Sequence, residues 1–121
     1  MDITTHLSEA LSRYLDVTSN EMKLTASNLA NVDTPGYKTQ GLNFSEAFRD
    51  ALRDIDSEKT VSSGAHVYNV DGLVARPDGN NVSMDRESLD LAKEQLQFRT
   101  GVELLKREYA RTMSAIHADA K

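Results

Sequence analysis

The stretch of sequence that decides the fold is ASNLANVDTPGYK, residues 26–38. Asn28 and Asn31 tolerate left-handed backbone and can satisfy the last carbonyl groups of a helix. Pro35 keeps the residue before it out of the helical region, and Pro35 with Gly36 suits the two central positions of a type II turn. The stretch therefore predicts that a helix ends here and that the chain then bends back.

The residues before this stop predict a long amphipathic helix from about Thr5 to Asn31. Its apolar or small side chains recur at alternating intervals of four and three residues, which places them in a narrow seam on one side of the helix. Threonines dilute this seam, so we expect the helix to pack among several neighbours rather than in a self-sufficient coiled coil. The seam consists of Leu11, Leu15, Thr18, Met22, Thr25, Leu29 and Val32.

A second long helix is predicted from near Ser83 or Asp85 almost to the end of the chain. It keeps the same alternation of four and three residues. Gly101 interrupts the pattern and is expected to weaken the middle of the helix by about 1 kcal/mol relative to alanine. The apolar stripe consists of Leu91, Gln95, Phe98, Val102, Leu105, Tyr109, Thr112 and Ile116, broadened by Leu89, Leu96 and Leu104.

Between the two long helices, residues from about 43 to 55 predict a short helix with Ser45 as its N-cap. Phe44 and Phe48 are four residues apart, so packing of two aromatic rings on one helical face accounts for them. The other residues predicted on this face are Ala51, Leu52 and Ile55.

Three further segments complete the middle of the chain. Residues 56–65 are polar and have the composition of a flexible linker. Residues 66–76 predict a β-hairpin, because short apolar runs flank Asp71-Gly72 and this pair favours a type I′ turn. Residues 77–81 form a second turn cluster that precedes the last helix.

These elements together predict a mainly α fold in one domain. The long N- and C-terminal helices pair as an antiparallel helical hairpin, a coiled-coil-like inner domain formed by residues 1–36 and 83–121. Residues 37–82 form a small insert that contains the short helix, the linker and the predicted β-hairpin.

The composition argues against several classes of function. The net charge is −5, whereas nucleic-acid-binding proteins usually carry a basic face. The chain has no cysteine, so disulfides and thiolate metal sites are excluded. No run approaches the ~18 apolar residues of a membrane span, and the first residues lack the basic and apolar regions of a signal peptide. We therefore expect no nucleic-acid partner, no membrane insertion and no cleaved signal peptide.

No pattern in the sequence indicates catalysis. His6, His66 and His117 are far apart, and none has a second ligand at a metal-binding spacing on a predicted helix. The sequence contains no glycine-rich phosphate loop and no nucleophile elbow. We therefore expect no catalytic residue, no cofactor and no metal ligand, and we do not expect an enzyme.

The residues around the helix stop carry a family resemblance. Residues 28–31 (NLAN) resemble a block shared by the axial proteins of the bacterial flagellum. Residues 33–38 (DTPGYK), 79–82 (GNNV) and 95–98 (QLQF) resemble the proximal-rod type within the flagellar basal-body rod protein family. The resemblance covers both ends of the chain and fades between about residues 56 and 69. The signature positions are Asn28, Leu29, Ala30, Asn31, Asp33, Thr34, Pro35, Gly36 and Tyr37.

This resemblance implies a structural subunit of the proximal rod of the bacterial flagellar basal body, needed for flagellum-dependent motility. Such subunits polymerise with other rod proteins and copies of themselves into a helical tube that transmits torque and surrounds the export channel. The further partners implied are the basal-body adaptor, the MS-ring and export-gate components at the rod base, and the flagellar type III export apparatus. The implied location is the rod in the periplasmic space.

Two sets of side chains receive expected roles in this interpretation. Phe44 and Phe48, beside their packing, resemble the export-gate signal of early flagellar secretion substrates. Packing between subunits is expected to involve the most apolar positions of the two seams. These are Leu11, Leu15, Met22, Leu29, Leu91, Phe98, Leu105, Tyr109 and Ile116.

Two alternatives remain open from the sequence. A soluble helical adaptor or export chaperone would bind one partner through the same stripes, and it would form a discrete complex instead of a filament. A sister proximal-rod subunit would share the same inner domain, and residues 33–37 (DTPGY) favour the type named above.

Overall fold

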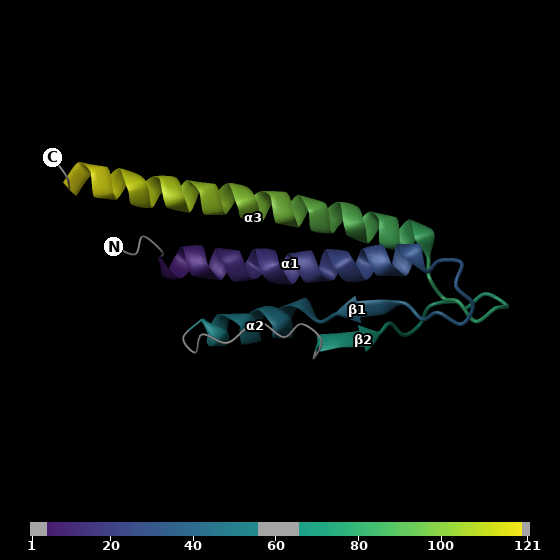
Figure 1. The fold of residues 1–121 in the computed structure, drawn as a ribbon. Coiled ribbons are helices and arrows are strands. Elements are labelled where there is room, and N and C mark those ends of the chain that lie inside the picture. The colour runs from purple at the N-terminus through teal and green to yellow at the C-terminus, as the bar shows by residue number, and fades with distance from the viewer. Residues whose placement is uncertain (1–4, 56–65, 120–121) are drawn as a thin grey trace.

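The computed structural model describes residues 5–55 and 66–119, and its elements follow the order α1, β1, α2, β2, α3 (Figure 1). The predicted linker at residues 56–65 lies outside the described residues. The bounds of the elements are His6–Ala30 for α1, Gln40–Leu42 for β1, Phe44–Asp54 for α2, Val67–Asn69 for β2 and Met84–Asp119 for α3.

α1 lies in the middle of the molecule, with α3 along one side and α2 with the small sheet along the other (Figure 1). α1 and α3 run antiparallel, because Thr5 at the start of α1 contacts Glu108 while Asn28 near its end contacts Glu87. This arrangement confirms the predicted mainly α fold with paired terminal helices. α1 is therefore the element against which both other parts of the chain pack.

Both ends of α1 follow from local sequence. At its start, Thr5 and Ser8 form a capping box. At its end, Gly36 adopts a φ of +75° and the amide of Tyr37 donates to the carbonyl of Thr34 at 3.2 Å, as in the predicted type II turn. Asn31 does not adopt the left-handed backbone that asparagine tolerates, since its φ is −103°, and its side chain instead donates to the carbonyl of Ser27 at the helix end.

α2 begins two residues earlier than the Ser45 cap requires. The N-cap is Asn43, whose side-chain Oδ1 accepts the amide hydrogen of Glu46 at 3.3 Å, so Ser45 already lies inside the helix. The buried positions of α2 are Ala47 and Ala51, whereas Leu52 is exposed. The prediction that Leu52 belongs to the packed face is therefore wrong, because Ala47 and Ala51 occupy the buried positions of α2.

The predicted hairpin at residues 66–76 is also wrong. β2 pairs antiparallel with β1, in the register Gln40↔Asn69, Gly41↔Tyr68 and Leu42↔Val67. The residues after Asp71-Gly72 form no strand, and that pair is a simple bend. The turn after α1 brings β1 alongside residues 67–69, so β2 finds a partner that is distant in sequence.

The apolar core is small and lies between α1, α2 and the sheet. Its fully buried members pack with partly buried Leu24, Phe44 and Val67. Beside it, the rings of Phe44 and Phe48 contact the ring of Tyr14 with centroids 5.5 and 5.8 Å apart. The buried members are Val17, Leu42, Ala47 and Ala51.

Candidate functional site

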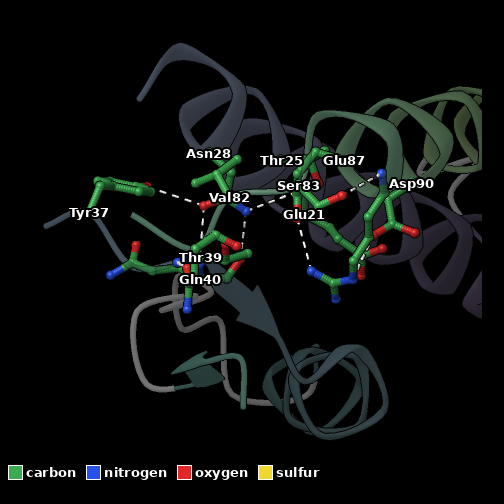
Figure 2. A network of polar contacts seen from close by, with 12 residues as sticks. Glu21, Thr25, Asn28, Tyr37, Thr39, Gln40, Val82, Ser83, Glu87 and Asp90 are labelled. Atoms are coloured by element: carbon green, nitrogen blue, oxygen red, sulfur yellow. Dashed lines mark hydrogen bonds and ion pairs between the residues drawn. The ribbon is translucent and has the colours of Figure 1, made fainter. Parts of the chain in front are cut away.

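The side chain of Asn28 is buried in the last turns of α1 and contacts the turn that follows the helix (Figure 2). Its Nδ2 group donates to the carbonyl of Gln40 at 2.8 Å and to a carboxylate oxygen of Glu87 at 3.0 Å. Its Oδ1 accepts from the amide of Gln40 and from the hydroxyl of Tyr37, both at 3.1 Å. An asparagine amide has two hydrogens and two lone pairs, so Asn28 is fully satisfied. It joins α1 to β1, to α3 and to the turn.

A second buried asparagine closes the end of α1. The Nδ2 group of Asn80 donates to the carbonyls of Asn31 and Thr34, both at 2.8 Å, and its Oδ1 accepts from the amide of Val82 at 2.8 Å. The last carbonyls of a helix lack partners within the helix, and here the 77–81 turn cluster supplies them. The two segments that carry the family resemblance, residues 28–37 and 79–82, therefore contact each other.

Two glycines with left-handed backbone lie where the two turns meet. The amide of Gly36 donates to the carbonyl of Asp78 at 2.9 Å. Gly79 has a φ of +86°, and a Cβ added to it would lie 3.5 Å from the Cα of Gly36. Both glycines adopt the left-handed backbone that other residues rarely use.

Of the remaining signature positions, Asn31, Thr34 and Gly36 join this contact through backbone groups. Asn31 accepts the hydroxyl of Thr34 through Oδ1 at 3.0 Å and donates to the carbonyl of Ser27 at 2.8 Å. Leu29 is half-buried, and the exposed positions are Ala30, Asp33, Thr34, Pro35 and Gly36. The signature therefore divides into an inner part, centred on Asn28, and an exposed rim.

The α1–α3 interface has a polar centre that the sequence patterns did not reveal. The buried residues of α3 are spaced seven apart, so they share one side of the helix. Thr25 donates its hydroxyl to Glu94 at 2.8 Å, and Thr5 donates to Glu108 at 2.9 Å. We call these positions the carboxylate line. It consists of Glu87, Glu94, Gly101 and Glu108.

Gly101 occupies the one position of the carboxylate line without a carboxylate. A Cβ added there would lie 2.8 Å from Cδ2 of Leu15 and 3.1 Å from the ring of Tyr14. Side chains of α1 therefore fill the space that a larger residue would need. A larger residue at position 101 would require Leu15 and Tyr14 to shift, so Gly101 allows a close approach of the helices at a weak point in helix propensity.

The three carboxylates of the line differ in their electrostatic surroundings. Hydrogen bonds from Arg111 and then Thr5 lower the pKa of Glu108. Glu87 pairs with Arg86 at 2.9 Å. Glu94 lacks such a partner, and burial raises its pKa to about 7. The line therefore contains two satisfied carboxylates and one whose pKa burial raises to about 7.

The predicted packing residues lie beside the carboxylate line. Most of them are half-buried, and Tyr109 is 39% exposed. The two threonines that dilute the seam of α1 are instead buried at its centre. A sequence signal for this arrangement exists, since glutamates recur at intervals of seven residues with Gly101 in the same series. The half-buried set is Leu11, Leu15, Met22, Leu29, Leu91, Phe98, Leu105 and Ile116.

The described part of the chain contains neither a cluster of metal ligands nor a membrane-spanning helix. Within residues 5–55 and 66–119, no group of three histidine, aspartate or glutamate side chains is arranged to hold a metal ion. His66 instead pairs with Asp50 of α2 at 2.8 Å. None of the helices described here combines the length and the apolar character needed to cross a bilayer.

Comparisons with known proteins agree on one family. The family described as "Flagella basal body rod protein" matches residues 8–38, which include the inner part of the signature. The flagellar basal body rod protein FlgB of Bacillus subtilis is 32% identical over 108 residues, which cover 81% of this chain and 80% of the relative. FlgB of Aeromonas hydrophila is 27% identical over 116 residues, covering 87% and 88% of the two chains. FlgB of Salmonella typhimurium is 29% identical over 108 residues, covering 75% and 78%. With this identity and coverage, the chain belongs to the flagellar basal body rod protein FlgB family.

Proposed function

We propose that this chain is a structural subunit of the proximal rod of the flagellar basal body, and that it polymerises with other rod proteins and copies of itself into a helical tube. Membership of the FlgB family supports a structural role in the basal body rod. The single observation that carries the polymerisation is the apolar surface of α3 that the chain leaves exposed.

α3 exposes six large apolar side chains. Leu89 and Leu96 are 63% and 65% exposed, and each follows a carboxylate of the buried line by two residues. Two residues correspond to about 200° around a helix, so these leucines lie on the side of α3 turned away from α1. A helix with apolar residues on two sides needs neighbours on both. The six residues are Met84, Leu89, Leu96, Leu104, Tyr109 and Met113.

Contacts through this outer side of α3 suit a filament. Burying one leucine contributes about 1.5–3 kcal/mol, so repeated contacts along a 36-residue helix can hold a subunit among several others. Head-to-tail contacts that do not close into a ring generate a helical assembly. Such an assembly transmits torque through many shared apolar contacts, and the paired terminal helices surround the export channel.

The remaining parts of the proposal concern delivery and neighbours. The chain is exported by the flagellar type III apparatus without a cleaved signal peptide, and it takes its place in the periplasmic part of the rod. Phe44 and Phe48 pack against Tyr14 in the folded chain, so an export-gate role requires the unfolded chain. At the rod base, its partners are the adaptor, MS-ring and export-gate components.

Replacement of an exposed leucine tests polymerisation without disturbing the α1–α3 pair. We expect Leu96→Asp to abolish swimming and to remove the chain from purified hook–basal bodies, because a charge then faces an apolar subunit contact. The cellular amount of the chain should stay unchanged. The matched control is Gln95→Asp, which adds the same charge at an adjacent exposed position and should leave swimming intact.

Two results would contradict this proposal. Normal swimming of the Leu96→Asp strain would mean that the outer side of α3 makes no essential contact. Absence of the unaltered chain from hook–basal bodies, together with a discrete complex with one partner, would indicate the adaptor or export chaperone.

A further inference from the structure

A polar cavity of 180 Å³ lies between α1, the sheet and α3, beside the polar network of Asn28. Figure 2 shows Glu21 and Asp90 close to Glu87, at the opposite end of this network from Tyr37. A single water occupies about 30 Å³ of liquid, so the cavity has room for a small polar group. Its acidic lining residues are Glu21, Glu87, Asp90 and Glu94.

Glu94 makes this cavity different from an ordinary acidic surface. The residue is 5% exposed, and its Oε1 accepts the hydroxyl of Thr25. Its Oε2 is buried and has no hydrogen-bond donor in the described structure. The side chain beside it is the carboxylate of Glu21. Two acceptors in contact require either a shared proton or a cation between them.

Two cations of the chain, Arg86 and Lys93, line this cavity, but neither forms an ion pair with Glu21 or Glu94. Arg86 pairs with Glu87 at 2.9 Å and lies 4.0 Å from Asp90. Lys93 is exposed, and its charge attracts Glu21 without forming an ion pair. Among residues 5–55 and 66–119, no lysine or arginine forms an ion pair with Glu21 or Glu94. The cavity therefore retains an excess of negative charge next to a buried carboxylate that lacks a donor.

We propose that this cavity is a docking site for the guanidinium group of an arginine from a neighbouring rod subunit, held by Glu21, Asp90 and Glu94. A guanidinium suits three converging carboxylates because its planar fork donates several hydrogen bonds at once. It is also less strongly hydrated than an ammonium group, so it enters a half-buried cavity more readily. The origin of the arginine in a neighbouring subunit rests on the proposed function.

The site exchanges a proton for the arginine. In the free chain, burial raises the pKa of Glu94 to about 7 and raises that of Glu21. A cation nearby favours the charged carboxylate, so docking releases the proton and strengthens as the pH rises through that range. The groups facing the pair are Thr25 from α1, Tyr68 from β2, and Arg86, Glu87, Asp90 and Lys93 from α3.

A titration of the full chain with Nα-acetyl-arginine methylamide tests the site. The readout is the carboxyl-carbon NMR signals of chain labelled with carbon-13 glutamate and aspartate, at about pH 8, where Glu94 is mostly ionised. We expect saturable shifts at Glu21, Asp90 and Glu94 and a lower apparent pKa of Glu94. The citrulline analogue has the same shape without the charge, and it should produce no saturable shift.

Variants of the same size separate the site from its surroundings. Glu94→Gln can still accept the hydroxyl of Thr25, so the helices should stay paired, as circular dichroism will show. We expect this variant to bind the arginine probe about tenfold more weakly, the effect of losing one charge partner of about 1.4 kcal/mol. The matched control Glu103→Gln alters an exposed glutamate of α3 and should leave the affinity unchanged.

Each contrary outcome overturns the proposal. Equal binding of the citrulline probe, or equal affinity of the Glu94→Gln variant, would exclude a charge-selective site. A Glu94 signal that titrates at its ordinary value in the free chain would show that the cavity does not form.

Swimming assays identify the source of the cation. Glu94→Gln should reduce swimming while Glu103→Gln does not. If a variant that no longer binds the arginine probe swims normally, the cation is a free one such as a polyamine. This result would overturn the neighbouring subunit as the source of the arginine. If the probe binds but the chain is absent from hook–basal bodies, the proposed function fails while the arginine site stands.

Discussion

The two sides of α1 are packed by opposite chemistry. On the side of α2 and the sheet, Val17 and Leu24 meet the apolar residues of a small core. On the side of α3, Thr5, Thr25 and Asn28 hydrogen-bond to buried glutamates. One helix therefore carries an apolar interface and a polar interface at the same time.

The difference teaches that burial on the two sides contributes different things. Removing apolar surface from water stabilises by about 25 cal/mol per Å², so the α2 side contributes folding free energy. Buried carboxylates lose hydration when they are buried, and their hydrogen bonds mainly offset that loss. They do fix the register: a slip of seven residues would move Gly101 to the place of Glu94 or Glu108 and leave a hydroxyl without its carboxylate. The interface on the α2 side therefore contributes folding free energy, and the interface on the α3 side fixes the register of the two long helices.

The largest effect should follow from a charge in the apolar interface. We expect Val17→Asp to lower the free energy of unfolding by about 4 kcal/mol, because a fully buried position then holds an unpaired carboxylate. This loss approaches the whole stability of a small domain. Urea unfolding followed by circular dichroism would measure it. The matched control Lys23→Asp places the same carboxylate at an exposed position of α1 and should change stability by less than about 0.5 kcal/mol. Equal effects of the two variants would contradict an apolar interface at Val17.

A smaller effect is expected in the polar network, from a substitution that preserves shape. Asn28→Asp removes both donated hydrogen bonds and brings a carboxylate to the place where Nδ2 lies 3.0 Å from Glu87. We expect a loss of about 2–4 kcal/mol, the cost of unsatisfied buried polar groups. The unfolding midpoint in urea is the measurement.

The chain offers a matched control for this change at Asn43. There the asparagine caps α2 through Oδ1 alone, and aspartate is an equally good N-cap. Asn43→Asp should therefore be nearly neutral. If Asn28→Asp were equally neutral, the four hydrogen bonds of Asn28 would not be what joins α1 to its neighbours.

The contrast between the two interfaces also explains what the sequence could predict. The alternation of four and three residues identified both long helices, and Pro35-Gly36 identified the turn that ends α1. These signals are local, so they survive without knowledge of tertiary contacts. The apolar positions also led to the correct pairing of the two terminal helices.

Partners distant in sequence could not be predicted in this way. Thr25 dilutes an apolar seam, and only the position of Glu94, 69 residues away, makes it the centre of an interface. The Asp71-Gly72 signal favoured a local hairpin, but β2 gained a partner in β1 instead. Asn28 was predicted as a signature residue from local sequence, whereas its contacts with Gln40 and Glu87 depend on the complete fold.

The smallest predicted effect concerns Gly101, where packing opposes helix propensity. Valine is a better helix former than glycine by a few tenths of a kcal/mol, so propensity alone predicts that Gly101→Val stabilises α3. The structure predicts the reverse, since even a Cβ at this position would lie 2.8 Å from Leu15 and 3.1 Å from Tyr14. We expect a loss of about 1–2 kcal/mol, typical of overpacking, measured as a lower midpoint of thermal unfolding.

The control Ala92→Val tests propensity without this contact, because Ala92 is an exposed position of α3. It should cost about 0.5 kcal/mol, the propensity difference between alanine and valine. The two substitutions create the same residue in the same helix, yet propensity predicts opposite signs for them and packing predicts the larger loss at Gly101. A higher midpoint for Gly101→Val would mean that α1 and α3 do not need their close approach there. The break in the carboxylate line would then have no packing reason, and alignment of the helices would depend on the glutamates alone.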